Sequence, residues 1–333
     1  MPRTFNSSIV IKTQLFFESS YVAKICLLFL GLVAVSFSSI FIYSGEQELS
    51  SNSTVFNRFW ISTIIYGTWS GIASFRRSSQ NLEVENNVYS YDTNSQNLST
   101  KVSNIHKCIV TIIIVGFCFC ANQVIWSWSL EHTSIANSTI LHNLTPIFTA
   151  LGSYLFLNQR FDQKFILGMM VAIVGATIME VKDLSLGFER FGGDLAALAS
   201  AMFYSAYLLA IEKLRNKLDI VNIVLGCCVV GCIIIIPLLL IQQDSLFPHS
   251  FGAWLSVIAL AVVCQMFGQA VIAYSLMKIP SGVVALSHLL CPCMTAIEAW
   301  LIFHQGLSIE NLLGFIIILT GLYFGLSSTT ARN

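Results

Sequence analysis

Residues 129–175 read SLEHTSIANSTILHNLTPIFTALGSYLFLNQRFDQKFILGMMVAIVG, and residues 275–321 read SLMKIPSGVVALSHLLCPCMTAIEAWLIFHQGLSIENLLGFIIILTG. A shift of 146 positions superimposes the two copies without a gap and matches several uncommon residues. The matched pairs include Ser129/Ser275, His142/His288, Pro146/Pro292, Thr149/Thr295, Gln159/Gln305, Gly168/Gly314 and Gly175/Gly321. Apolar segments resemble one another by chance, but proline, histidine and glycine rarely match at fixed register. The pattern therefore indicates an internal duplication.

The composition indicates a chain whose surface faces lipid. Of 333 residues, 55% are hydrophobic and only 10% are charged, and the mean hydropathy is +0.74. A soluble domain carries about 25% charged residues. The formal net charge of zero gives no sign of a nucleic-acid partner. We therefore expect a membrane protein that contacts the lipid bilayer and binds no nucleic acid.

Apolar stretches of about 20 residues, the length that spans a bilayer, occur ten times. They are residues 25–43, 55–75, 108–129, 133–157, 165–181, 194–211, 221–241, 251–277, 281–303 and 309–327. The sequence thus predicts an all-α polytopic membrane protein with ten transmembrane helices.

The basic residues support this number of spans. With a cytoplasmic N-terminus, 14 of the 17 lysines and arginines fall on the inner side, and only Arg58, Lys182 and Arg190 fall outside. This asymmetry is the one that membrane proteins show. Five spans in each copy is an odd number, so the second copy enters from the opposite face. The prediction is two inverted five-helix repeats with both termini in the cytoplasm.

The domain organisation follows from these spans. Residues 76–104 are rich in Ser, Asn and Gln and lack an apolar face, which is typical of a polar cytoplasmic loop. We expect, in order, an N-terminal tail 1–24, a first repeat 25–181 that contains this loop, a second repeat 192–327, and a C-terminal tail 328–333.

Several local sequences resemble a known transporter family. They are Asn57-Arg58-Phe59 in the second span, LFLNQ at residues 155–159, Gly168 to Gly175, and Gly193-Asp194 at the sixth span. Together with the repeat, they make the chain similar to EamA-type members of the drug/metabolite transporter superfamily. The resemblance implies ten helices and transport of a small molecule. Family members export amino acids and other small metabolites, and relatives carry nucleotide sugars or triose phosphates.

Each copy places a histidine four residues before a proline: His142 before Pro146, and His288 before Pro292. A proline inside a helix removes a backbone hydrogen bond, and transporters often place such interruptions at substrate sites. The histidines could pass protons or could join neighbouring helices. The prolines could line a cavity or simply kink the helix. The two histidines are candidate residues of the substrate pathway, and the two prolines are candidate helix breaks.

Other polar and aromatic residues join this candidate pathway. Gln123 and Gln269 form a second matched pair, whose amides could contact a polar substrate or bridge helices. Trp126 lies three residues after Gln123 and shares its helix face, although it could belong to an aromatic belt at the membrane surface. Tyr204 and Tyr207 share a face of the sixth span and have the same two interpretations.

Glu298 lies within the ninth span, where the first copy has Gly152. An acidic group inside a bilayer costs about 2.5–3.5 kcal/mol on insertion scales, so it usually has a function. It could bind a proton or a substrate ammonium group, or it could lie near the interface within reach of water.

The sequence does not indicate metal chemistry or a cofactor. Cys291-Pro292-Cys293 resembles the metal path of heavy-metal pumps, but such pumps need large cytoplasmic domains that this chain lacks.

The glycines of the fifth and tenth spans recur at four- and seven-residue spacing, which predicts close helix packing.

Taken together, these features predict a secondary transporter, not an enzyme, that exports a small metabolite such as an amino acid. Proton coupling, a homodimer and a bacterial plasma-membrane location complete the hypothesis. The alternatives are a nucleotide-sugar or phosphate-ester carrier and, from another class, a membrane scaffold or an intramembrane enzyme.

Overall fold

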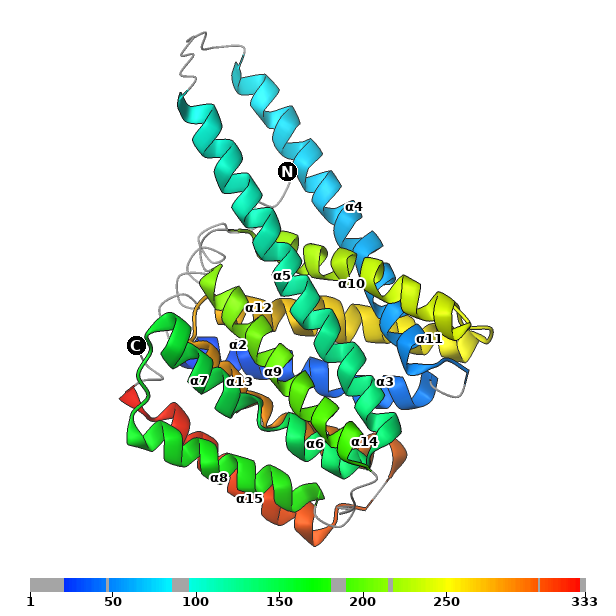
Figure 1. Ribbon diagram of the computed structural model, residues 1–333, viewed down its shortest axis with the longest axis vertical. Helices are drawn as coiled ribbons and strands as arrows, with labels where there is room; N and C mark the ends of the chain where they lie inside the picture. Colours follow the sequence, from blue (N-terminus) through cyan, green and yellow to red (C-terminus); the bar gives the residue numbers. More distant parts are fainter. Residues whose placement is uncertain are drawn as a thin grey trace, which may run out of the picture.

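The computed structural model describes residues 21–45, 48–85, 96–180, 190–214, 218–304 and 306–329, and all regular elements in these ranges are helices (Figure 1). Residues 1–20 and 330–333, most of the expected tails, lie outside the described residues. Within the described ranges, nine spans are long and apolar enough to cross a membrane.

The first repeat contains α2 (Tyr21–Ser36), α3 (Ser38–Gly45), α4 (Ser51–Glu85), α5 (Gln96–His132), α6 (Ile135–His142), α7 (Thr145–Leu157) and α8 (Gln163–Glu180). The second contains α9 (Phe191–Lys213), α10 (Ile220–Gln242), α11 (Phe251–Ala259), the π-helix η3 (Leu260–Gly268), α12 (Gln269–Leu276), α13 (Ser281–His288), α14 (Cys291–Phe303) and α15 (Ile309–Leu326). These elements follow the ten predicted spans. The predicted span that is not among the nine is the second one, which corresponds to α4. This helix packs along α10 but is less apolar, because it carries Asn57 and Arg58.

The duplication is visible in the backbone. The pairs α6/α13, α7/α14 and α8/α15 have the same lengths, and their bounds differ by the same 146 positions as the sequence copies. Asn158 ends α7 at φ 53°, and its counterpart His304 ends α14 at φ 54°. Side chains other than glycine rarely adopt this left-handed conformation. Its recurrence at matched positions confirms the two repeats.

The repeats meet closely at α8 and α15, which lie side by side (Figure 1). A Cβ atom built at Gly321 would lie 2.5 Å from the backbone nitrogen of Ala172 and 2.6 Å from the carbonyl oxygen of Gly168. The related pair Gly175 and Gly314 is similar, because a Cβ on Gly314 would lie 2.7 Å from the Gly175 carbonyl oxygen. The predicted packing role of these glycines is confirmed.

The outer surface of the bundle is apolar. Large hydrophobic side chains are exposed on helices from both repeats, with 75% of Phe156 and 79% of Ile241 accessible. Soluble proteins do not expose contiguous apolar surface on this scale. The protein is therefore an integral, multi-pass membrane protein with a lipid-facing surface.

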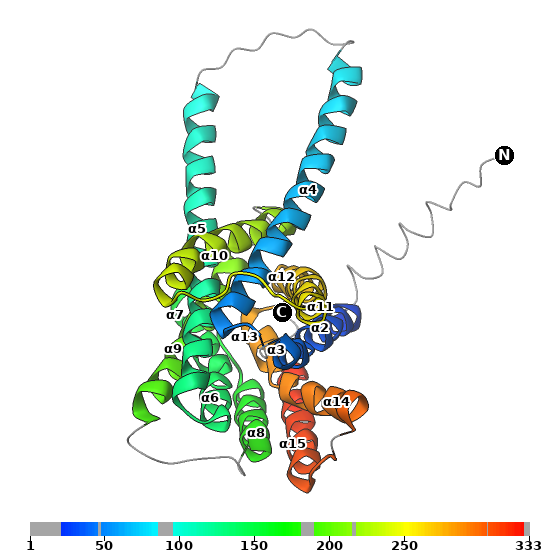
Figure 2. The same ribbon diagram turned by 90° about the vertical axis from the view of Figure 1, so that its right-hand side faces the viewer.

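The structure differs from the expected loop at residues 76–104. Helix α4 continues to Glu85 and α5 begins at Gln96, so both helices project beyond the rest of the bundle (Figure 2). Residues 86–95 lie outside the described part of the chain. The described parts of this segment, residues 76–85 and 96–104, contain no glycine or proline, and polar side chains alone do not prevent helix formation.

Candidate functional site

The interruptions of the fourth and ninth spans position the two histidines. Helix α6 ends at His142 and α13 ends at His288, and the next helix starts after a two-residue break in each copy. Pro146 and Pro292 lack the N–H group that would bond to the carbonyl four residues earlier, which belongs to the histidine. In the first copy, the Thr145 hydroxyl donates to the His142 carbonyl at 2.7 Å instead. Each of these two spans is therefore divided into two helices just before its proline.

Both histidines contact the same helix, α9. His142 Nδ1 lies 2.9 Å from Ser200 Oγ, and His288 Nε2 lies 2.6 Å from Tyr204 Oη. Ser200 and Tyr204 are one helical turn apart. The ring centroid of Tyr204 lies 5.9 Å from that of His142 and 5.3 Å from that of His288. His142 of the first repeat and His288 of the second repeat therefore both lie beside the ring of Tyr204.

The hydrogen bonds indicate which nitrogen of each neutral ring carries the proton. His288 Nδ1 lies 3.0 Å from the Val284 carbonyl oxygen, which can only accept, so Nε2 accepts from the Tyr204 hydroxyl. Ser200 donates its own proton to the Ala197 carbonyl, so its Oγ accepts from His142 Nδ1. His142 Nε2 then has no partner among the described residues and is free to accept a hydrogen bond.

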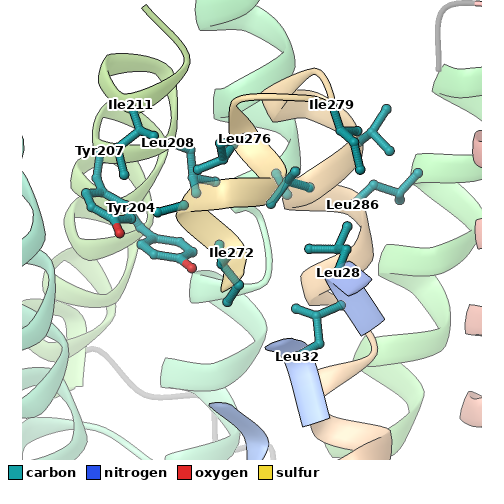
Figure 3. Packing of buried hydrophobic residues seen from close by; sticks show 14 of the residues in the cluster. Leu28, Leu32, Tyr204, Tyr207, Leu208, Ile211, Ile272, Leu276, Ile279 and Leu286 are labelled. Atoms are coloured by element: carbon teal, nitrogen blue, oxygen red, sulfur yellow. The ribbon is translucent and has the colours of Figure 1, made fainter. Parts of the chain in front are cut away.

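Aromatic side chains surround this pair of histidines. The Trp126 ring lies 5.6 Å from that of His142, and Tyr207 stacks on Tyr204 at 5.7 Å. Tyr207 Oη lies 3.5 Å from Gln269 Oε1, at the limit of a hydrogen bond. Figure 3 shows both tyrosines projecting from α9 towards Ile272 on α12. We name Trp126, His142, Tyr204, Tyr207, Gln269 and His288 the central cluster.

The central cluster holds unused hydrogen-bonding groups of both kinds. Trp126 Nε1 is buried with no acceptor within the described ranges, and His142 Nε2 offers an acceptor nearby. Buried polar groups are normally paired, and each unpaired one requires an explanation. A polar ligand that both accepts and donates hydrogen bonds would satisfy these two groups.

Two of the predicted pathway residues make no hydrogen bond to the central cluster. Gln123 is half-buried on α5, one helical turn before Trp126, and makes no side-chain hydrogen bond to the described residues. Glu298, on α14, contacts α2 instead: its Oε1 lies 2.5 Å from Ser36 Oγ. Its Oε2 is buried without a partner in the part of the chain that the structure describes.

Arg58 is a functional candidate whose burial the sequence does not reveal. Hydropathy puts it near the outer end of the second span, and the structure places it close to the start of α4, buried with 5% of its surface accessible. Its Nε donates to Gln265 Oε1 at 2.7 Å. The NRF triplet that contains Arg58 signals the family but does not show which way the side chain points. Ser200 gave no signal at all, because serine is common in membrane helices.

Comparisons with known proteins agree with this architecture. The profile of the EamA-like transporter family matches residues 22–181 and 191–327, one match for each repeat. The pseudopaline exporter CntI of Pseudomonas aeruginosa is 25% identical over 195 residues, which cover 59% of this chain and 67% of that protein.

Two further relatives carry other names. A Streptantibioticus cattleyicolor protein, provisionally named a terminal-alkyne amino-acid exporter, is 23% identical over 54% of this chain and 60% of its own. A Dictyostelium discoideum protein, provisionally named a UDP-sugar transporter, is 24% identical over 43% of this chain and 37% of its own.

A solved crystal structure of a protein shares the fold. It superimposes with a TM-score of 0.70 and 14% identity, covering 91% of this chain and 98% of the other. With the family profile covering both repeats and nine described spans that are long and apolar enough to cross a membrane, the chain belongs to the EamA-like transporter family.

Proposed function

We propose that this protein is a secondary transporter that exports a small metabolite such as an amino acid. The substrate binds at the central cluster, and access alternates between the two membrane faces as one repeat rocks against the other. The observation that carries this proposal is the meeting of His142 and His288, one from each repeat, around Tyr204 on α9.

The chemistry of the central cluster supports a small polar substrate with an apolar part. Trp126 Nε1 and His142 Nε2 offer an unused donor and an unused acceptor, and the rings of Tyr204 and Tyr207 offer apolar faces. Ligand sites commonly combine aromatic walls with a few convergent polar groups. The hydrogen bond between His142 and Ser200 joins the two repeats, so a movement of α6 relative to α9 would break it.

Glu298 is the residue that we propose for proton coupling. Its carboxyl group is 6% accessible and has one hydrogen-bond partner, Ser36, which lies on the other repeat. An ionised carboxylate is costly in such a place, and a protonated one is not. We propose that Glu298 takes up and releases a proton as the repeats rock.

We also propose a bacterial plasma-membrane location with both termini in the cytoplasm, and a homodimer as the assembly.

A nucleotide-sugar or phosphate-ester carrier is the second candidate. The buried Arg58 favours an anionic substrate, and one relative is named for UDP-sugars. A diphosphate carries more negative charge than one guanidinium can neutralise, and Arg58 is the only buried lysine or arginine among the described residues. The amino-acid proposal is therefore preferred.

The proposal is tested by release of metabolites from cells that overproduce the protein. Cells fed with mixed dipeptides accumulate amino acids inside, and we expect several-fold more of at least one amino acid in the medium when the wild-type protein is present. The matched control is the double variant His142→Ala/His288→Ala at equal membrane abundance, which should release no more than cells without the protein. Equal release in all three strains rules out the export of amino acids.

A further inference from the structure

The second candidate site in the bundle is centred on a buried positive charge. Arg58 lies on α4, a helix that packs against α10 and η3, and 5% of its surface is accessible. A guanidinium group remains charged at any physiological pH and carries five N–H donors. A buried charge is tolerated only when it is paired or has a function.

One of these donors is accounted for by Gln265. Arg58 Nε donates to Gln265 Oε1 at 2.7 Å, and Gln265 Nε2 lies 3.6 Å from the sulfur of Cys228. Because a guanidinium only donates, the amide oxygen must face it, and the contact with Cys228 holds the amide in that orientation. Gln265 lies within the π-helix η3. Such segments shift the direction of side chains and often occur at functional sites.

No carboxylate pairs with Arg58 in the described ranges. The two other buried charged residues there have different partners. Glu212 binds Gln159 and the backbone N–H of Ser281, and Glu298 binds Ser36. The only hydrogen bond that Arg58 makes to the described residues is the one through Nε. The terminal nitrogens, which form the planar fork that binds carboxylates, are therefore unused.

The arginine lies beside the central cluster. Its charge is within electrostatic range of the phenol groups of Tyr204 and Tyr207. Gln265 is one helical turn before Gln269, which contacts Tyr207. An anion bound to the free edge of the guanidinium would therefore lie next to the aromatic rings that we propose as the substrate site.

We propose that Arg58, held in place by Gln265, binds a carboxylate group of the transported molecule. This inference rests on the proposed function and narrows its substrate class to small monocarboxylates such as amino acids. Charge balance supports a substrate with a single carboxylate group, because one guanidinium neutralises one carboxylate. A paired, bidentate contact between the two is also the strongest geometry available to arginine.

The test uses exchange by the full-length protein in liposomes. The probe is a radiolabelled mixture of the protein amino acids, with two unlabelled competitors: the corresponding amino-acid amides, which have no carboxylate, and UDP-glucose, which has a diphosphate. We expect the wild type to exchange the amino acids and the amides to compete at least about tenfold more weakly, because they lack the group that Arg58 binds.

The decisive variant is Gln265→Glu, which keeps the shape of the side chain and places a carboxylate against Arg58. The internal ion pair should occupy the guanidinium and reduce amino-acid exchange about tenfold or more, while the protein unfolds at the wild-type temperature or higher. A purely structural arginine would gain from this pairing and lose no transport. The matched control is Gln243→Glu, the same change at an exposed position.

The Arg58→Gln variant should lose amino-acid exchange to a similar degree. If Arg58→Gln does not fold, the result with Gln265→Glu decides whether Arg58 binds the substrate. Wild-type exchange rates in Gln265→Glu, or amides that compete as well as amino acids, overturn the inference but not the transport function. Competition by UDP-glucose alone assigns Arg58 to a phosphate and also overturns it. If the wild type moves no amino acid at all, the proposed function fails, and the inference fails with it.

Discussion

Replacing Gly321 with leucine is expected to eliminate most of the folded protein. The hydrogen at Gly321 faces the backbone of α8, and a Cβ atom there would lie 2.5 Å from Ala172 N, closer than real contacts allow. The atoms that this Cβ would meet belong to the backbone of α8, so rotating a side chain cannot relieve the clash. Leucine favours helix over glycine by about 1 kcal/mol, so any loss of stability must come from helix packing between the repeats.

The measurement is the fraction of protein that remains monodisperse in detergent after heating. Gly321→Ala should lower the unfolding temperature by several degrees, because overpacking a tight contact costs about 1–3 kcal/mol, and Gly321→Leu should leave little folded protein at any temperature. Gly71→Leu is the matched control, since Gly71 lies in α4 with no atom within 4 Å of a Cβ built there. Gly321→Leu protein as stable as the Gly71 control would mean that α8 and α15 do not pack in this way.

Replacing Glu298 with glutamine is expected to abolish the dependence of transport on a pH gradient. Glutamine has the same shape, and its side-chain oxygen can still accept from the Ser36 hydroxyl, which donates to Glu298 Oε1 at 2.5 Å in the wild type. Glutamine cannot bind or release a proton, so the proposed exchange of a proton for substrate cannot occur. Exchange of substrate for substrate, which needs no proton movement, should continue.

The readout is substrate movement in liposomes with and without an imposed pH gradient. The wild type should respond to the gradient, and Glu298→Gln should give the same rate in both conditions. Glu131→Gln is the matched control, because Glu131 is exposed at the end of α5. A full response to the gradient in Glu298→Gln would remove this residue from the mechanism.

Several features of the fold were predictable because they depend on residues with strong backbone effects. The duplication, the interruptions at Pro146 and Pro292, and the glycine contacts between the fifth and tenth spans all follow from proline or glycine at fixed register. The helical extension of α4 and α5 could not be predicted in this way: neither extension contains glycine or proline, but serine and asparagine, which are common there, are weak helix formers. A polar composition indicated solvent exposure but said nothing of the backbone.

The candidate site was predictable only in part. Repeat symmetry singled out His142 and His288, and the structure brings them together around Tyr204. The burial of Arg58 could not be predicted, because hydropathy gives a residue's distance from a helix end but not its direction. The π-helix η3, which positions Gln265, was hidden for a similar reason. A uniformly apolar stretch looks the same whether its backbone bonds to the fourth or the fifth preceding residue.

The most direct test of transport through the space between the repeats is counterflow in liposomes without ATP. Liposomes that contain the purified protein are loaded with unlabelled protein amino acids and then diluted into a trace of the radiolabelled mixture. The account predicts that label accumulates transiently inside and that His142→Ala/His288→Ala, which removes the central pair, does not accumulate it. Label in the wild-type liposomes no higher than in protein-free ones, or accumulation that the double variant retains, would contradict it.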